Sequence, residues 1–267
     1  MADKHIKFEI TDSVGIITLD RAEARNALTA VMVAELGEAI EACKRPAVRA
    51  VLLTGSGGAF CSGADVKLMV EELEKGGPQG IHDHLHALAN ELHTNVVLGL
   101  RRLEKPVVAG INGVAAGGGF SLMLACDLRV AANSARFLMA YAGIGATADG
   151  GSTYLLPRIV GSGRAMEIYL ASQPIGAQAA LEMGLVHQVV DDEHLHQHAM
   201  ETAVRLAQGP TLAYGRVKAL FDNSWDTDIA TQLDSEREAL ANSGLTADFQ
   251  EGIKAFAERR QARFQGK

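Results

Sequence analysis

Two glycine-rich segments have the composition of a site that binds developing negative charge. Residues 57–65 read GGAFCSGAD and residues 112–120 read NGVAAGGGF. Glycine lets backbone N–H groups approach a ligand closely, and a helix that begins there favours negative charge. Two convergent N–H groups suit a thioester oxygen, which gains charge as an enolate forms. The alternative is that these glycines only permit tight turns and close packing. A P-loop is excluded, because Phe120 rather than Lys follows the triple glycine.

Asp149 is the candidate acid/base group, in the segment 148–153, which reads ADGGST. A single positioned carboxylate can remove a proton and return it elsewhere on the same molecule. The alternative is that Asp149 caps a helix that starts near Gly150, a common role for Asp before a helix. The residues alone leave both interpretations open.

The histidines that alternate by two do not predict a metal site. Alternation by two scatters side chains around a helix, and no HExxH pattern is present. They are interpreted as a solvated helical surface; they are His82, His84, His86, His194, His196 and His198. Tyr141 and Trp225 are predicted to line a pocket or fill the core, because aromatic side chains mostly contribute buried area.

The elements that must position these groups alternate between strands and helices. Short strands are predicted at 8–10, 14–19, 50–53 and 107–111. Apolar spacing predicts a helix after residue 29, and further helices follow each glycine loop. Such alternation favours right-handed βαβ crossovers and a largely parallel sheet, in which ligands bind outside the carboxyl ends of the strands. Both glycine loops fall at those ends, so we expect them to face one site.

Two further segments flank this core. Gly76–Gly80 separates a charged helix at 67–75 from a longer one that ends near Leu103, and it is typical of a mobile flap. From residue 191 the sequence predicts helices at 193–208, 211–221, 229–242 and 247–263. We therefore predict an α/β core at 1–190 and a helical region at 191–267 that covers the site or mediates assembly.

Composition narrows the class of protein. The chain has 267 residues, 48% hydrophobic and 21% charged, with a formal net charge of -7. This acidic balance, without a basic run, disfavours nucleic acid and anionic membranes as partners. Residues 106–126 carry no charge, but their glycines argue against a membrane helix. The three cysteines lack CxxC spacing and suit a reducing compartment, so a cytoplasmic location is expected.

Four segments, in order, resemble the enoyl-CoA hydratase/isomerase (crotonase) superfamily. They are RAEARNAL, AFCSGADVKLM, PVVAGINGVAAGGGFSLMLACDLRVA and GGSTYLLPRIVGSGRAMEIYLASQPIGAQAALEMGLVHQVV. The similarity runs from about Val14 to Val190, and the later helices match more loosely. The resemblance implies a spiral of ββα turns with a C-terminal helical appendage, assembled as trimers or as hexamers made of two trimers.

The resemblance also implies site residues. The two oxyanion-hole N–H donors fall on Ala64 and Gly118. Backbone near Ala24 and from Ala64 through Asp65 and Val66 to Lys67 is expected to hold coenzyme A, which arrives as part of an acyl-CoA thioester. Neither a metal nor a separate cofactor is expected.

Departures from the family pattern bear on the reaction. Hydratases of this family have two catalytic glutamates, at positions where this chain has Ser121 and Tyr141, so efficient hydration is disfavoured. Asp149 resembles the acidic position of several enoyl-CoA isomerases, including the ring-epoxide isomerase of phenylacetyl-CoA breakdown. The resemblance therefore favours a 1,3-proton shift at Asp149.

Three alternatives stay open, and the first is a weak enoyl-CoA hydratase. Asp149 also resembles the nucleophile of 4-chlorobenzoyl-CoA dehalogenases, which have a tryptophan where this chain has Tyr141 and a histidine near His93. An ungapped count places Thr94 at that histidine position, one residue away. A member of another class, a non-catalytic acyl-CoA-binding relative, would keep the fold without turnover.

Overall fold

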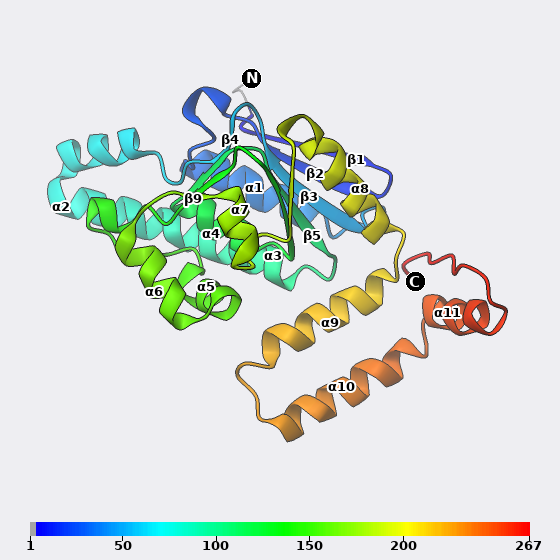
Figure 1. The fold of residues 1–267 in the computed structure, drawn as a ribbon. Helices are drawn as coiled ribbons and strands as arrows, with labels where there is room; N and C mark the ends of the chain where they lie inside the picture. Colours follow the sequence, from blue (N-terminus) through cyan, green and yellow to red (C-terminus); the bar gives the residue numbers. More distant parts are fainter. Residues whose placement is uncertain (1–3) are drawn as a thin grey trace.

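The computed structural model describes residues 4–267 and contains a large, mostly parallel sheet in the order β1-β2-β3-β5-β7-β10 (Figure 1). β1 and β2 form an antiparallel hairpin, and all the later neighbours are parallel. The strand bounds are β1 Ile6–Thr11, β2 Val14–Leu19, β3 Ala50–Gly55, β5 Val107–Ile111, β7 Leu128–Ala132 and β10 Gln188–Val190. Each strand predicted from the sequence is therefore present.

A second, smaller sheet has the order β4-β6-β8-β9 and turns the chain into a spiral. Its strands are β4 Ala59–Cys61, β6 Val114–Ala116, β8 Arg136–Leu138 and β9 Ile175–Gly176. β3, β5 and β7 of the large sheet each lead, after a short turn, into β4, β6 and β8, which pair in parallel with one another. A helix follows each such pair, so the repeated unit is a ββα turn.

The helices cover the sheet because its strands are apolar on both faces. All five residues of β5 are buried, and α8 packs along β3, β5 and β7. At Gly110 a methyl group would lie 3.2 Å from the Cβ atom of Ala199 on α8. The helix bounds are α1 Ala30–Ala42, α2 Val66–Glu91, α3 Leu98–Arg102, α4 Gly118–Leu124, α5 Ser152–Val160, α6 Ser162–Ala171, α7 Ala177–Glu182, α8 Leu195–Ala207, α9 Thr211–Asn223, α10 Ile229–Ser243 and α11 Ala247–Ala257. Short 3-10 turns are η1 Ala22–Ala24, η3 Ala142–Ile144 and η4 Asp192–His194.

Helix α2 contains the predicted break and continues into a π-helical turn. Gly77 has φ 61°, outside the helical region, and it separates the two segments of α2. After α2 the chain forms the π-helical turn η2, Leu92–Val97, where the N–H of Leu98 donates to the carbonyl of His93 five residues earlier. The helical path then ends at Arg102 on α3, one residue before the predicted end. Whether the Gly76–Gly80 segment acts as a flap stays a prediction.

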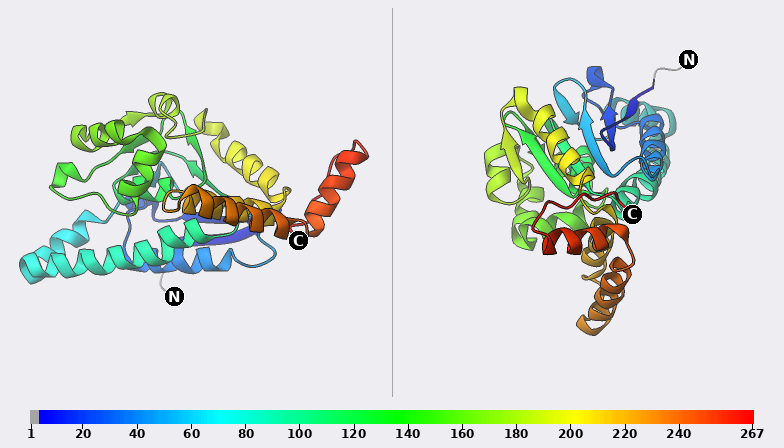
Figure 2. Two further views of the ribbon diagram at one scale, coloured as in Figure 1. Left: turned by 90° about the horizontal axis from the view of Figure 1, so that it is seen from below. Right: turned by 90° about the vertical axis from the view of Figure 1, so that its right-hand side faces the viewer.

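The C-terminal helices extend away from the α/β core (Figure 2). α9 and α10 pack side by side, and α11 lies beyond them. α11 ends at Ala257, six residues before the predicted end, because Arg259 adopts φ 54° in the left-handed region. The tail then folds back, and the carboxylate of Asp248 accepts from the N–H groups of Gln265 and Gly266.

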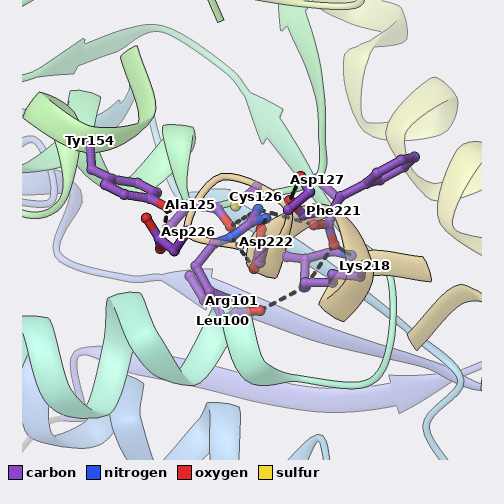
Figure 3. Close-up of polar contacts among 12 residues, drawn as sticks. Leu100, Arg101, Ala125, Cys126, Asp127, Tyr154, Lys218, Phe221, Asp222 and Asp226 are labelled. Carbon is purple, nitrogen blue, oxygen red and sulfur yellow. Dashed lines mark hydrogen bonds and ion pairs between the residues drawn. The ribbon is translucent and has the colours of Figure 1, made fainter. Parts of the chain in front are cut away.

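A buried group of charged side chains fastens α9 to the core (Figure 3). Lys218 on α9 donates to the carbonyl of Leu100 at 2.7 Å and to the carboxylate of Asp127 at 2.8 Å. Arg101 on α3 contacts Asp127 at 3.2 Å and also pairs with Asp222 on α9. Asp127 accepts, in addition, from the N–H of Val107 at the start of β5. One carboxylate thus joins α3, β5 and α9.

Large apolar side chains are exposed along the C-terminal helices. The set includes Phe221, Ile229, Leu233, Leu240, Leu245, Ile253 and Phe256. Trp225 is 62% exposed and lies against Arg158, so it is not part of the core; it lines a surface pocket together with Tyr154 and Phe221, as the alternative prediction expected. Within residues 4–267 no helix combines the length and the apolar character needed to cross a membrane.

Candidate active site

Asn26 organises the first glycine loop, and sequence reasoning missed it. Its side chain is fully buried, and Nδ2 donates to the carbonyls of Ser56, Ala59 and Phe60. Its backbone adopts φ 56°, a conformation that asparagine tolerates better than most residues. The three carbonyls that Nδ2 binds are thirty or more residues away in the sequence. No local pattern around Asn26 therefore marks this role.

A short bridge places Ala64 beside the second glycine loop. The N–H of Leu28 donates to the carbonyl of Gly63 at 2.7 Å, and the N–H of Asp65 donates to the carbonyl of Leu28 at 3.0 Å. A methyl group on Gly63 would lie 3.2 Å from the nitrogen of Gly118, and one on Gly118 would lie 4.0 Å from the nitrogen of Ala64. The two loops therefore meet.

The amides of Ala64 and Gly118 both lack a protein acceptor. Gly118 is the first residue of α4, so its N–H has no partner within the helix. In the bridge to Leu28, the amide of Asp65 donates the hydrogen bond and the amide of Ala64 takes no part. Within residues 4–267 neither amide donates a hydrogen bond to the protein. Two adjacent free donors form a site where a negatively charged oxygen can bind.

The glycine run is required by geometry at two of its positions. Gly117 has φ 49°, which other residues rarely adopt. At Gly119 a Cβ atom would lie 2.2 Å from the carbonyl oxygen of Cys61, so only glycine allows α4 to begin this close to β4. The run therefore sets the approach of the two loops as well as their turns.

Asp149 lies at the end of the loop before α5 and is approached by two side chains. The hydroxyl of Tyr141 donates to Oδ1 at 2.6 Å. The Nε2 atom of His93 lies 3.4 Å from Oδ2. The Asp149 side chain is 34% exposed, so it can reach a bound molecule. Burial and the neighbouring Asp149 carboxylate raise the pKa of Tyr141 far above its ordinary value, which keeps its hydroxyl protonated.

Ser121 links this carboxylate to the glycine run. It is fully buried, and its Oγ atom lies 2.9 Å from the hydroxyl oxygen of Tyr141 and 2.8 Å from the carbonyl oxygen of Asp149. Ser121 stands three residues after Gly118 on α4, and such a spacing puts two residues on one helix face. One turn of α4 thus connects the free amide of Gly118 to the surroundings of Asp149.

The structure excludes the capping interpretation of Asp149. Helix α5 begins at Ser152 after Gly151, and no side chain caps it. The backbone carbonyl of Asp149, rather than its carboxylate, accepts from the N–H and the hydroxyl of Ser152. The carboxylate is therefore free for other contacts.

His93, and not Thr94, is the residue beside Asp149. His93 is the second residue of the π-helical turn η2, and the ungapped count that gave Thr94 is one residue off. Nε2 of His93 also accepts from the N–H of Gly150 at 3.1 Å. This nitrogen is therefore an unprotonated acceptor, and its contact with Oδ2 of Asp149 is not an ion pair in this arrangement.

The residues expected to hold coenzyme A are near the first loop. The Ser62 hydroxyl donates to the carbonyl of Ala24 at 3.4 Å. Asp65 caps α2 by accepting from the N–H of Lys67, and it pairs with Arg21 at 2.7 Å. Burial acts to raise the pKa of Asp65, but the Arg21 bond and charge outweigh it, and the pKa is lowered. Val66 and Lys67 begin α2 and are exposed there.

In the described part of the chain no three His, Cys, Asp or Glu side chains are grouped as metal ligands. Neither histidine triplet gathers around such a point. His82 and His86 stack at 6.2 Å, and His194 and His198 meet edge to face at 6.3 Å. These histidines therefore belong to helix surfaces.

A spiral of ββα turns followed by helices defines the crotonase fold, and comparison with known proteins identifies the family. A model of the enoyl-CoA hydratase/isomerase family matches residues 9–267. The chain is 39% identical over 262 residues to a probable enoyl-CoA hydratase of Rhodobacter capsulatus, with 98% of each covered. It is 38% identical over 259 residues to the 1,2-epoxyphenylacetyl-CoA isomerase of Escherichia coli, with 97% of each covered. The chain belongs to the enoyl-CoA hydratase/isomerase family.

Other relatives differ in reaction. The chain is 39% identical over 218 residues to a 4-chlorobenzoyl coenzyme A dehalogenase of Arthrobacter, covering 81% of this chain and 77% of that one. The crystal structure of the enoyl-CoA hydratase of Bacillus anthracis matches with a TM-score of 0.89 at 33% identity, covering 98% of this chain and 100% of that one. Membership makes the protein an acyl-CoA enzyme, and the local chemistry must distinguish among the reactions.

Proposed function

We propose that the protein is an enoyl-CoA isomerase in which Asp149 carries out a 1,3-proton shift. The observation that carries this proposal is the arrangement of Asp149, whose Oδ1 is held by Tyr141 and whose Oδ2 faces His93 without receiving a proton from it. Ser121 and Tyr141 occupy the two positions expected for hydratase glutamates, and both contact Asp149 instead. A single carboxylate suits a proton shift better than the addition of water.

The proposed reaction moves one proton and no other atom. Asp149 removes a proton from the carbon next to the thioester carbonyl of a 3-enoyl-CoA. The electron pair delocalises onto the thioester oxygen, which the N–H groups of Ala64 and Gly118 stabilise as a dienolate. Asp149 then returns the proton to the γ-carbon, and a 2-enoyl-CoA results.

Substrate binding is assigned to the first loop and the start of α2. Backbone near Ala24 and from Ala64 to Lys67 holds the adenine and pantetheine portions of coenzyme A, and Tyr141 borders the acyl pocket. The reaction transfers a proton without a change of oxidation state, so the proposal requires no metal and no separate cofactor. A cytoplasmic location belongs to the same proposal.

A dehalogenase-like reaction is the second candidate, and the position of His93 favours it. There Asp149 would attack the ring carbon that carries chlorine, chloride would leave, and water activated by His93 would hydrolyse the resulting ester. However, Nε2 of His93 already accepts from the N–H of Gly150. It must break that bond before it can take a proton from water, which ranks this reaction below isomerisation.

Self-assembly is also part of the proposal. We infer a homotrimer, or a dimer of two trimers, in which the exposed apolar side chains of α9, α10 and α11 contact a second copy. Monomeric proteins rarely expose contiguous apolar patches of this kind. Assembly would bury Leu240 and Phe256, which are 67% and 87% exposed in the single chain.

Mass spectrometry in heavy-oxygen water tests the reaction. The protein is incubated with 3-enoyl-CoA, 2-enoyl-CoA and 4-chlorobenzoyl-CoA, beside Asp149→Asn and His93→Gln. We expect the enoyl isomers to interconvert without added water, with turnover at least about 100-fold lower in Asp149→Asn. His93→Gln keeps an acceptor for the N–H of Gly150 and is expected to retain isomerisation.

The other outcomes each identify a different reaction. Heavy oxygen in Asp149 with release of chloride, lost in His93→Gln, would replace the proposal with nucleophilic substitution. Hydroxyacyl-CoA as the product would establish hydration. A protein that binds coenzyme A equally well with Asp149→Ala, and converts no acyl-CoA, would be a binding relative.

A further inference from the structure

Three side-chain oxygens form a buried chain that ends at the carboxylate of Asp149. Ser121 Oγ lies 2.9 Å from the hydroxyl oxygen of Tyr141, which lies 2.6 Å from Oδ1 of Asp149. Ser121 is fully buried and Tyr141 is 9% exposed. These are the two positions where the family resemblance implies hydratase glutamates, so the chain of oxygens replaces a pair of carboxylates.

Counting hydrogens fixes the donor at the carboxylate. An ionised Asp149 has no proton to donate, so Tyr141 must donate to Oδ1. Ser121 has one hydrogen, and its Oγ atom lies 2.8 Å from the carbonyl oxygen of Asp149 and 2.9 Å from the hydroxyl oxygen of Tyr141. The Asp149 carbonyl can only accept, so Ser121 donates to it and contacts the Tyr141 hydroxyl through its oxygen. Ser121 therefore holds the backbone of Asp149 while Tyr141 holds its side chain.

We propose that Ser121 and Tyr141 are positioning residues of the Asp149 site: Tyr141 fixes Oδ1, Ser121 holds the backbone carbonyl of Asp149 and contacts the Tyr141 hydroxyl, and Oδ2 is left as the oxygen that exchanges the substrate proton. This inference rests on the proposed proton shift for its role in catalysis. Neither hydroxyl exchanges a proton with the substrate.

The Tyr141 hydroxyl also stabilises the charge of the base, because a donor to a carboxylate interacts favourably with its ionised form. The titratable side chains that contact the carboxylate in the described structure are Tyr141, from the loop before η3, and His93, from η2. Tyr141 keeps its proton because burial and the carboxylate raise its pKa. His93 is replaced in the test so that the profile reports on the carboxylate and Tyr141.

The test compares pH profiles of kcat/KM in Tyr141→Phe, Ser121→Ala and the double variant, each with and without His93→Gln. Each change removes one oxygen and little volume. We expect the acid limb of Tyr141→Phe to move to higher pH, because the carboxylate loses a hydrogen-bond donor. Ser121→Ala is expected to shift it less, because Ser121 does not donate to the carboxylate. The double variant is expected to shift it at least as far as Tyr141→Phe. kcat is expected to fall more than KM changes.

Tyr169→Phe is the matched control. The Tyr169 hydroxyl donates at 3.0 Å to the carbonyl of Ala146, in the same loop, without contacting the carboxylate. Its acid limb is expected to stay in place. An unmoved limb in Tyr141→Phe, an equal shift in Tyr169→Phe, or a larger shift in Ser121→Ala than in Tyr141→Phe would overturn the proposal.

Infrared difference spectroscopy separates this inference from the proposed reaction, because it needs no turnover. The protonated-carboxyl band that Asp149→Asn removes is followed with pH in each variant. An upward shift of its midpoint in Tyr141→Phe supports the hydroxyl chain even if no enoyl isomer is converted. An unshifted midpoint rejects the chain even if isomerisation is established.

Discussion

The side chains around Asp149 show how the same residue types support different chemistry through their hydrogen bonds. His93 would be a candidate base if its Nε2 atom were free, but the N–H of Gly150 occupies that atom. Tyr141 would be a filler if its hydroxyl had no partner, but it contacts Asp149 and Ser121. Which proton each atom carries therefore decides the reaction that the site favours.

Gly118→Pro tests the second oxyanion donor at this scale. Gly118 is the first residue of α4, the helix position that tolerates proline best, and its N–H has no protein acceptor. The substitution removes that N–H, and we expect turnover to fall by about 100-fold or more. Steady-state kinetics measure the loss, and circular dichroism checks the fold. Unchanged turnover would show that the Gly118 amide does not contact the reacting oxygen.

The sequence located the site residues but not their contacts. The glycine loops, Asp149 and Tyr141 were all singled out, because composition and family resemblance mark them. Asn26 escaped notice, since its partners Ser56, Ala59 and Phe60 are distant in sequence. The choice between His93 and Thr94 depended on which of two neighbouring helix residues faces Asp149, and hydrophobic periodicity alone did not decide it.

At the scale of elements, some helices are held in place by apolar contacts and others by charged contacts. α8 packs on the sheet through small apolar residues, whereas α9 is fastened by the group around Asp127 (Figure 3). The start of α1 was predicted closely from apolar spacing, since the helix expected after residue 29 begins at Ala30. The end of α11 was not, because it depends on the left-handed Arg259 and the folded-back tail.

Asp127→Ala is expected to destabilise the fold by about 3 kcal/mol or more, because it leaves Arg101 and Lys218 partly buried without their shared partner. Urea unfolding at one fixed protein concentration measures the change. Asp226→Ala is the control, since this exposed aspartate makes one hydrogen bond of 3.4 Å, to Tyr154, and its loss is expected to cost less than about 0.5 kcal/mol. Equal effects in the two variants would contradict the role of Asp127.

The three buried cysteines can reveal local opening of the structure around each of them. Cys43, Cys61 and Cys126 are buried, and burial raises the pKa of each thiol to about 12. The reactive thiolate is therefore scarce at neutral pH. We expect a thiol reagent to modify none of them in the native protein and all three in urea. Rapid labelling of a cysteine without urea would reveal local opening of the element that carries it.

At the scale of the whole molecule, the α/β core and the C-terminal helices differ in how many of their large apolar side chains are buried. Most large apolar side chains of the core are buried, although α6 exposes Met166 and Leu170, whereas α10 and α11 expose most of theirs. The prediction that the boundary falls at residue 191 rests on the start of this helical region. In the structure its first helix, α8, packs on the sheet, and the later three extend outward.

Self-assembly predicts a mass near three or six times that of one chain in light scattering. A double variant, Leu240→Asp and Phe256→Asp, places charge in the exposed apolar set and is expected to lower that mass. Glu238→Lys, on the same helix as Leu240 but already polar, is the control. A wild-type mass of one chain at micromolar concentration would reject the assembly.

The π-helical turn also sets how this part of the chain can tolerate a change in its length. Such a turn forms when a helix accepts one additional residue while the helical segments on either side keep their positions. Deletion of one residue between 94 and 97 would therefore restore an ordinary helix and leave both His93 and the buried Leu100 in place. A deletion in a regular segment such as α3 has no extra residue to remove, and it would rotate one side of the helix against the other by about 100°. The histidine beside this carboxylate can thus survive a change of chain length in η2 that it would not survive in α3.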